Sequence, residues 1–167
     1  MKNQPVESNK LKPARAQINQ RWWFLLPLFW AAIIFFQSSR TAVQSDEQSY
    51  FIVSFINTFV SSLFGRELML VSNHLVRKLA HFTEYALFGS MLVNAFIRNT
   101  FLRPLLVTIL VGVLYAASDE IHQYFVPGRS MRFFDVCIDS AGILFGTFCT
   151  RWLLNKHKTK HTFKESV

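Results

Sequence analysis

The sequence predicts an all-α, polytopic membrane protein: a four-helix transmembrane bundle with an extra amphipathic interfacial helix in its first outer loop. The chain of 167 residues is 51% hydrophobic and contains 18 Phe, which is more apolar than a typical soluble domain. Its formal net charge is nevertheless +8. The basic residues lie at the ends of the apolar segments, as expected beside lipid head groups, so membrane lipids are expected partners and nucleic acid is not.

Four segments have the length and composition of membrane-spanning helices: residues 22–39, 79–97, 104–124 and 133–154. The first begins with a Trp pair, which is typical of the lipid interface, and contains Pro27 close to its start, where it can bend the helix without breaking it. No small-residue cleavage site follows this segment, so we expect it to remain as an uncleaved anchor.

These helices delimit a membrane domain over residues 22–154. Residues 1–21 are polar and basic and contain Pro5 and Pro13, which predicts a disordered cytoplasmic tail. Residues 155–167 form a second basic tail, expected to meet anionic lipid on the cytoplasmic side.

Residues 48–64 contain no charge, and the pattern leaves open whether they span the membrane, dip into it or lie on it. The polar residues follow one helical stripe: Ser54, Asn57, Thr58, Ser61 and Ser62. This spacing predicts an amphipathic interfacial helix. Four spans with both termini cytoplasmic place twelve basic residues inside and six outside, whereas a fifth span would give ten and eight. The larger bias favours four spans.

The acidic residues separate by side in this topology. Only Glu7 and Glu165 belong to the tails. The others lie outside or in the outer halves of the helices: Asp46, Glu47, Glu67, Glu84, Asp119, Glu120, Asp135 and Asp139. Because a carboxylate in hydrocarbon costs a few kcal/mol, the intramembrane acids are expected to share partners or water.

Helical spacing gathers ionisable side chains at the outer ends of the last three spans. Residues spaced i, i+4, i+7 and i+8 share one face: Arg77, His81, Glu84 and Tyr85. In the last span, Asp135 and Asp139 align with two glycines, Gly142 and Gly146, which permit close approach of another helix.

A Pro-Gly pair at residues 127–128 predicts a tight turn that holds Arg129 over the helix ends. The predicted ligand-binding residues are the polar and ionisable ones of these faces and of the turn: Arg77, Lys78, His81, Glu84, Tyr85, Asp119, Glu120, His122, Gln123, Arg129, Asp135 and Asp139.

Three motifs follow one another along the chain: Arg77-Lys78-x-x-His81-Phe82-x-Glu84-Tyr85, Asp119-Glu120-x-His122-Gln123 and Val126-Pro127-Gly128-Arg129-Ser130. Together with Asp135, Gly142 and the edge of the first helix at residues 36–40, they resemble the VanZ-like family of membrane proteins, named for a teicoplanin-resistance accessory protein. The chain departs from the family pattern at Asp139, where an amide is more common. The resemblance implies a four-helix protein of the bacterial cell envelope, in the plasma (inner) membrane, associated with lowered glycopeptide susceptibility. It supplies no established reaction.

The first functional hypothesis is recognition of a polar or phosphate-bearing head group, either of a lipid or of a cell-wall precursor. Arginine and lysine side chains bind phosphate oxygens through charge-assisted hydrogen bonds. The cations available for this contact are Arg77, Lys78, Arg129 and Arg132. The neighbouring carboxylates would orient them and bind amine or hydroxyl groups.

The alternative hypothesis is a metal-assisted enzyme acting on an envelope lipid or cell-wall precursor. Its candidate catalytic residues are His81, Glu84, Asp119 and Glu120, and its candidate oxygen ligands for a divalent cation are Asp119, Glu120, Asp135 and Asp139. A proton or ion pathway fits less well, because the cytoplasmic halves of the helices contain no polar relay. The sequence by itself assigns no cofactor and no metal ligand, and does not decide whether the protein is an enzyme.

Overall fold

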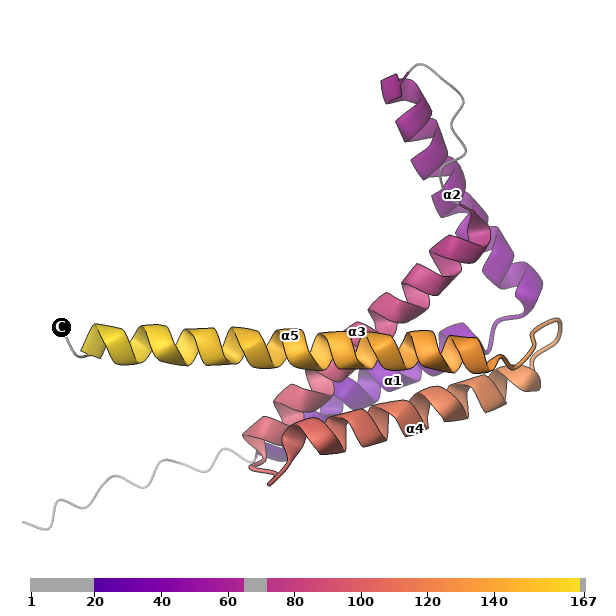
Figure 1. The fold of residues 1–167 in the computed structure, drawn as a ribbon. Helices are drawn as coiled ribbons and strands as arrows, with labels where there is room; N and C mark the ends of the chain where they lie inside the picture. Colours follow the sequence, from indigo (N-terminus) through magenta and orange to yellow (C-terminus); the bar gives the residue numbers. More distant parts are fainter. Residues whose placement is uncertain (1–19, 65–71, 166–167) are drawn as a thin grey trace, which may run out of the picture.

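A computed structural model describes residues 20–64 and 72–165 of the chain. These residues are almost entirely helical (Figure 1). A short 3₁₀ helix, η1 (Gln20–Phe24), precedes the α-helices α1 (Leu25–Ser38), α2 (Ala42–Phe64), α3 (Asn73–Arg98), α4 (Pro104–Tyr124) and α5 (Phe133–Glu165). Of the predicted disordered tail at residues 1–21, only the last two residues lie within the described part.

The first predicted helix is divided into η1 and α1. In a continuous α-helix the N–H of residue 27 would bond the carbonyl of Trp23, but Pro27 has no N–H. Pro27 is instead the third residue of α1, where its N–H would have no intrahelical partner in any case. The predicted helix is therefore a 3₁₀ turn followed by an α-helix, with Pro27 in the first turn of the α-helix.

Two helices begin earlier than the hydrophobic pattern indicates. The α2 helix begins at Ala42 because Thr41 and Gln44 form reciprocal hydrogen bonds, with Gln44 N donating to Thr41 Oγ1 at 3.4 Å and Thr41 N donating to Gln44 Oε1 at 3.2 Å. This arrangement is a capping box. The α3 helix begins after Ser72, whose hydroxyl accepts a hydrogen bond from Leu75 N at 3.3 Å.

The remaining helices, α4 and α5, differ in how closely they follow the predicted ranges. The α4 helix covers the predicted range and begins with Pro104 at its first position, where proline is favoured. The α5 helix runs 33 residues, to Glu165, so part of the predicted basic tail is helical.

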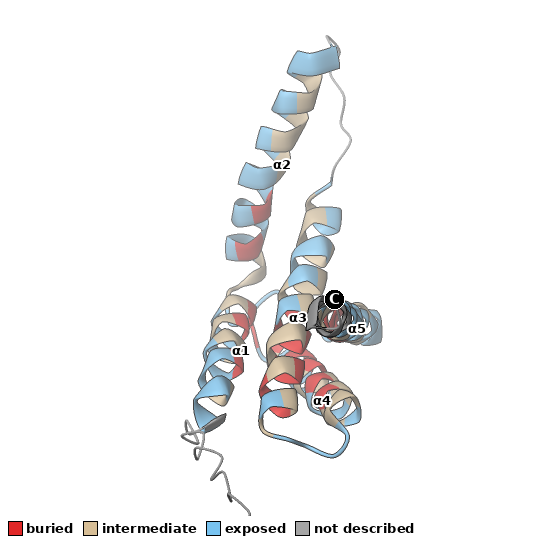
Figure 2. Cartoon of the chain, turned by 90° about the vertical axis from the view of Figure 1, so that its left-hand side faces the viewer, coloured by how far each residue is buried: buried red, intermediate tan, exposed pale blue. Residues whose placement is uncertain are grey.

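Helix α3 lies among the other helices. Figure 2 shows α1 on one side of it and α4 and α5 on the other, with buried residues on the faces that α1, α3 and α4 turn toward one another. The buried hydrophobic cluster draws most of its residues from α3: Ile34, Tyr85, Phe88, Leu92, Phe96, Ala116 and Ile143.

Glycines bring α5 into the close contact with another helix that the sequence predicts, and the partner is α3. A Cβ atom on Gly142 would collide with the carbonyl oxygen of Phe82, and one on Gly146 would collide with that of Ala86. The hydroxyl of Ser90 donates hydrogen bonds to the carbonyl oxygens of Ala86 at 2.8 Å and of Gly146 at 3.1 Å. This close approach fixes the position of the first two turns of α5 beside α3.

Three helical segments are long and apolar enough to cross a membrane: Arg21–Ser38, Pro104–Tyr124 and Phe133–Lys156. Their outward sides expose large apolar residues, such as the stripe of Leu106, Leu110 and Leu114 on α4. Helix α3 is not among these segments, because its inward-facing polar residues lower its hydropathy. Helix α2 leaves the bundle at a steep angle to α5 (Figure 1).

Candidate functional site

A polar cavity of about 100 Å³ lies where the start of α5, the end of α4 and the first turns of α3 meet. The turn between α4 and α5 and the start of α2 close its remaining sides. Most of its lining residues are ionisable or polar: Ala42, His74, Arg77, Lys78, His81, Glu120, Gln123, Gly128, Arg129, Ser130, Arg132, Asp135, Ile138 and Asp139.

The turn that delivers Arg129 forms as the sequence predicts. Arg129 N donates a hydrogen bond to Val126 O at 3.1 Å, and Gly128 has a φ of 78°. Proline at the second position and glycine with positive φ at the third characterise a type II turn. Ala42 N donates a hydrogen bond to Pro127 O at 3.3 Å, which ties the turn to the start of α2.

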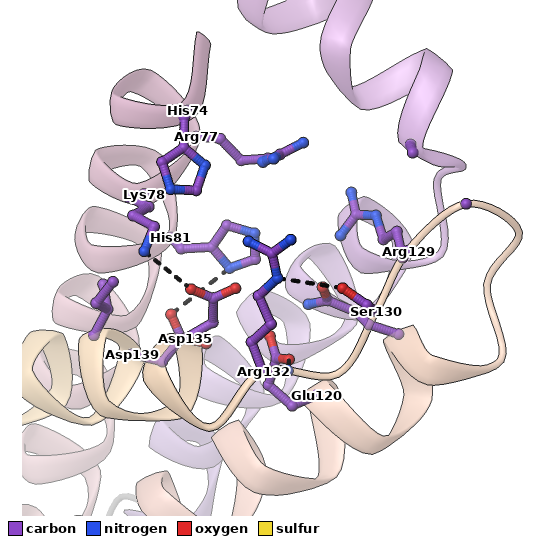
Figure 3. Close-up of a pocket in the computed structure, with 14 residues that line it drawn as sticks. His74, Arg77, Lys78, His81, Glu120, Arg129, Ser130, Arg132, Asp135 and Asp139 are labelled. Carbon is purple, nitrogen blue, oxygen red and sulfur yellow. Dashed lines mark hydrogen bonds and ion pairs between the residues drawn. The ribbon is translucent and has the colours of Figure 1, made fainter. Parts of the chain in front are cut away.

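Three arginines face this cavity from different segments. Figure 3 shows the side chains of Arg77, Arg129 and Arg132 directed into the same space. Arg77 Nη1 lies 2.9 Å from Asp46 Oδ1 on α2, and Arg132 Nε donates a hydrogen bond to Ser130 Oγ at 3.3 Å. In the described part of the chain, no hydrogen bond or ion pair engages the Arg129 guanidinium.

Burial and neighbouring charges both affect the Arg129 guanidinium. Burial lowers the pKa of its guanidinium, and the nearby Arg77 lowers that pKa further. Three carboxylates act in the opposite direction: Asp119, Glu120 and Asp46. Positive charges converge here without a direct anionic partner for Arg129, an arrangement that an anion would stabilise.

Carboxylates line the cavity together with these arginines. Lys78 Nζ lies 3.4 Å from Asp135 Oδ1 (Figure 3). Glu120 is almost completely buried, and its Oε2 accepts a hydrogen bond from Arg132 N at 3.0 Å. The Glu120 carboxylate therefore holds the start of α5 against the end of α4.

A second group of acids lies deeper between the helices. Asp119 is 3% exposed and Asp139 is 0% exposed. His81 Nδ1 lies 3.7 Å from Asp139 Oδ1, which is longer than a hydrogen bond. Potential metal-ligating atoms of His81, Asp119 and Asp139 lie within 4.8 Å of one another.

Asp119 also connects α4 to α1. Its Oδ2 accepts hydrogen bonds from Ser38 Oγ at 2.7 Å and from Gln123 Nε2 at 3.0 Å. Ser38 is 1% exposed and Gln123 is also buried, so both side chains that donate to Asp119 are sheltered from water. The last residue of α1 is thereby linked to the acids of the site.

Eight of the twelve predicted ligand-binding residues line the cavity: Arg77, Lys78, His81, Glu120, Gln123, Arg129, Asp135 and Asp139. The other four lie outside its lining. Asp119 and Tyr85 are buried between the helices. Glu84 is half-buried, and its backbone carbonyl accepts a hydrogen bond from Trp30 Nε1 at 2.9 Å. His122 contacts α1, with Nε2 3.0 Å from Ser39 Oγ and its ring 4.5 Å from that of Phe35.

Several residues of the site fall outside the predicted set. His74 lines the cavity because α3 begins at Asn73. Ser130 lines it in the segment before α5. Arg132, predicted from the sequence as a phosphate-contacting cation but not among the twelve ligand-binding residues, lines it as well. Ser38 and Asp46 reach the site through tertiary contacts. The Ser72 cap is the sequence signal that could have placed His74 on a helix.

Comparison with known protein families gives a match that covers the site. The sequence pattern of the VanZ/LLP1 family matches residues 23–154, which is most of the chain. The chain belongs to the VanZ/LLP1 family. No curated protein and no solved structure is significantly similar to it.

The VanZ/LLP1 match includes all three motifs that line or support the cavity. Family membership and the three apolar helices together make the chain a VanZ-like membrane protein. Some residues of the family motifs also line the cavity, and the arginines among them can bind an anion. The acids beneath them can accept hydrogen bonds or coordinate a cation.

Replacing Ser38 tests the link between α1 and the buried acids. We expect Ser38→Ala to lower the free energy of unfolding by about 1.5–3 kcal/mol, because it removes a hydrogen bond to a buried carboxylate. Thermal or chemical unfolding of the purified protein in detergent measures this change. The matched control is Ser118→Ala, whose exposed hydroxyl bonds only the carbonyl of Tyr115 at 2.7 Å and should change stability by less than about 0.5 kcal/mol. Equal effects of the two changes would show that the Ser38–Asp119 contact does not form.

Proposed function

We propose that this VanZ-like protein recognises a phosphate-bearing head group, of a membrane lipid or a cell-wall precursor, at the outer face of the bacterial plasma membrane. The observation that carries the proposal is the convergence of Arg77, Arg129 and Arg132 on one cavity. Guanidinium groups bind phosphate through paired, charge-assisted hydrogen bonds. A bound phosphate would supply the anion that Arg129 lacks among its described neighbours.

The size and lining of the cavity favour a head group over an entire lipid. Its volume of about 100 Å³ is below the range of pockets that enclose a drug-sized ligand. Carboxylates of Asp135 and Asp139 line the cavity together with the arginines and could accept hydrogen bonds from hydroxyl or amine groups on the same molecule. Acyl chains would remain outside, among the apolar outer surfaces of the helices.

The proposed membrane arrangement has four spans: α1, α3, α4 and α5. Helix α3 contains 26 residues, which gives a length of about 39 Å at 1.5 Å per residue, enough to cross a bilayer. Its neighbours shield it, so its polar residues need not face lipid. Burial of polar side chains inside a bundle is the usual way in which a less apolar helix is accommodated in a membrane.

Helix α2 is proposed to lie at the outer membrane interface. It carries a stripe of exposed aromatic residues, Phe51, Phe55 and Phe59, on a helix that leaves the axis of the bundle (Figure 1). An amphipathic helix with such a stripe can insert its apolar side into the boundary between head groups and acyl chains. The ion pair between Asp46 and Arg77 ties its first turns to the site.

The proposed orientation has both termini in the cytoplasm. It places the cavity outside and gives the larger number of basic residues to the cytoplasmic side, as the positive-inside bias requires. Binding of a cell-wall precursor at an outer site would connect the protein to the lowered teicoplanin susceptibility associated with VanZ-like proteins.

Loss of the Arg129 guanidinium tests the head-group proposal. We expect Arg129→Ala to weaken retention of anionic phospholipid by about 10- to 100-fold, because charge-assisted hydrogen bonds contribute about 1.5–3 kcal/mol. Native mass spectrometry of the purified protein, titrated with phosphatidylglycerol, measures the bound fraction. The control is Arg103→Ala, an exposed arginine at the opposite end of the bundle. Equal lipid retention by the two variants would refute the proposal.

Accessibility labelling tests the orientation independently of binding. In a variant with the exposed Cys137 and Cys149 replaced by serine, we expect a cysteine at Ser130 to react with a membrane-impermeant maleimide in intact cells. A cysteine at Asn155 should react only after the cells are opened, because it lies near the proposed cytoplasmic end of α5. The reverse pattern would invert the topology and place the cavity in the cytosol.

A further inference from the structure

The deepest polar group of the protein is formed by one side chain from each of three helices. His81 comes from α3, Asp119 from α4 and Asp139 from α5, and one potential ligating atom of each lies within 4.8 Å of the others. Gly142 of α5 packs closely against α3 at Phe82, the residue after His81. Asp139 lies one turn before Gly142, so this contact brings the turns of α3 and α5 that carry His81 and Asp139 side by side.

The acids in this group have unused hydrogen-bonding capacity. Asp139 is fully buried, and neither of its carboxylate oxygens has a hydrogen-bond partner. The Oδ1 of Asp119 and the Nδ1 of His81 also lack one. Buried polar atoms in native proteins are nearly always paired, so three side chains with unpaired oxygen or nitrogen atoms this close together indicate a ligand.

The charges around this group indicate the charge of that ligand. Lys78 is paired with Asp135, and Arg77 is paired with Asp46. The charge of Arg129 also acts on His81 and Asp119, but no hydrogen bond or ion pair among the described residues joins Arg129 to them. Protonation of His81 would offset only one of the two carboxylates. Because uncompensated buried charge costs several kcal/mol, a divalent cation beside a neutral imidazole gives a better balance: two negative charges meet two positive ones.

We propose that His81, Asp119 and Asp139 bind a divalent transition-metal ion of the Zn²⁺ or Mn²⁺ type. One imidazole nitrogen with two carboxylates is a donor set suited to these ions, whereas Mg²⁺ and Ca²⁺ prefer oxygen ligands alone. Metal–ligand bonds of about 2.0–2.2 Å require donor atoms about 3.4 Å apart in a tetrahedral site. Side-chain rotations that shorten the distances between the three ligand atoms, which are at most 4.8 Å, by up to about 1.4 Å would reach this geometry.

The surrounding contacts already orient one of these ligands. Ser38 and Gln123 both donate to Oδ2 of Asp119, which leaves Oδ1 available for the ion. Hydrogen bonds of this kind fix metal-binding carboxylates in other proteins. Sequence spacing alone could not assign the set, because its three members are on different helices.

The ion would occupy the floor of the cavity. His81 and Asp139 line the cavity and Asp119 lies behind them, so remaining coordination positions would face the space beneath the arginines. Metal binding at this position is independent of the head-group proposal, since the three ligands are in place without any lipid.

Metal content of the purified full-length protein tests the proposal directly. The protein is prepared without a histidine tag, stripped with a chelator in lipid-free detergent, and titrated separately with Mn²⁺, Zn²⁺ and Mg²⁺. Electron paramagnetic resonance measures free Mn²⁺, and elemental analysis measures retained Zn²⁺. We expect one tightly bound Mn²⁺ or Zn²⁺ per chain and weaker binding of Mg²⁺.

Substitutions separate this site from the other acids of the cavity. Asp139→Asn and Asp119→Asn should weaken metal binding by at least about 100-fold, whereas Asp135→Asn, one turn before Asp139 on the same helix, should weaken it by less than about 10-fold. His81→Gln provides a third variant if either aspartate change prevents folding. A metal-induced rise in melting temperature should occur in the wild type and Asp135→Asn only.

Two results would overturn the proposal. One is a wild-type protein that retains neither Mn²⁺ nor Zn²⁺ after titration. The other is equal metal binding by Asp135→Asn and the folded variants of the three ligands, which would place the ion elsewhere. Because these titrations contain no lipid, neither result bears on the head-group proposal.

Discussion

Carboxylates enclosed by an apolar helix bundle need positive or hydrogen-bonding partners, and this requirement organises one end of the protein. Glu120, Asp119 and Asp139 are nearly or fully buried where α3, α4 and α5 meet. Each helix on its own would expose such a group to hydrocarbon, at a cost of a few kcal/mol. Only the assembled bundle, with the turn before α5 folded over it, gives Glu120 the backbone N–H of Arg132 and gives Asp119 the hydroxyl of Ser38. Asp139 has no hydrogen-bond partner among the described residues.

This requirement explains why the helices differ in composition. Helices α1, α4 and α5 expose apolar side chains over most of their outer surfaces, whereas α3 carries polar residues and contributes most of the buried cluster. His81 and Glu84 on α3 are partly buried, because neighbouring helices pack against that side of the helix. The glycine contacts between α3 and α5 then bring the charged turns close enough to share one cavity.

Much of the fold was accessible from the sequence, because hydropathy and helical spacing depend on local composition. The class, the order of the helices and a close helix contact at the glycines of α5 follow from such patterns, whereas the partner in that contact, α3, does not. The division at Pro27 and the early starts of α2 and α3 did not, although the Thr41–Gln44 capping box and Ser72 are local signals that a closer inspection of helix termini would detect. The continuation of α5 through a basic segment has no hydrophobic signature.

The site was accessible only in part. Helical spacing correctly placed Arg77 and His81 on one face, and the Pro-Gly pair correctly predicted the turn that carries Arg129. Spacing could not show that His122 turns toward Phe35 and Ser39. Nor could it show that Asp46 on α2 reaches Arg77, or that Ser38 reaches Asp119. These contacts depend on the packing of helices far apart in the chain.

The central claim is that the converging arginines hold a phosphate group. Solid-state NMR of the protein with ¹⁵N-labelled arginine, in bilayers of phosphatidylglycerol, measures dipolar coupling between ³¹P and the guanidinium nitrogens. Phosphate held by the site would give a P–N distance of about 4 Å, since the N–O contacts themselves are about 2.8 Å. We expect this short component to lose intensity in Arg129→Lys, because one of the three arginines of the cavity no longer contributes, and to be retained in Arg103→Lys. A spectrum that Arg129→Lys leaves unchanged would contradict the claim.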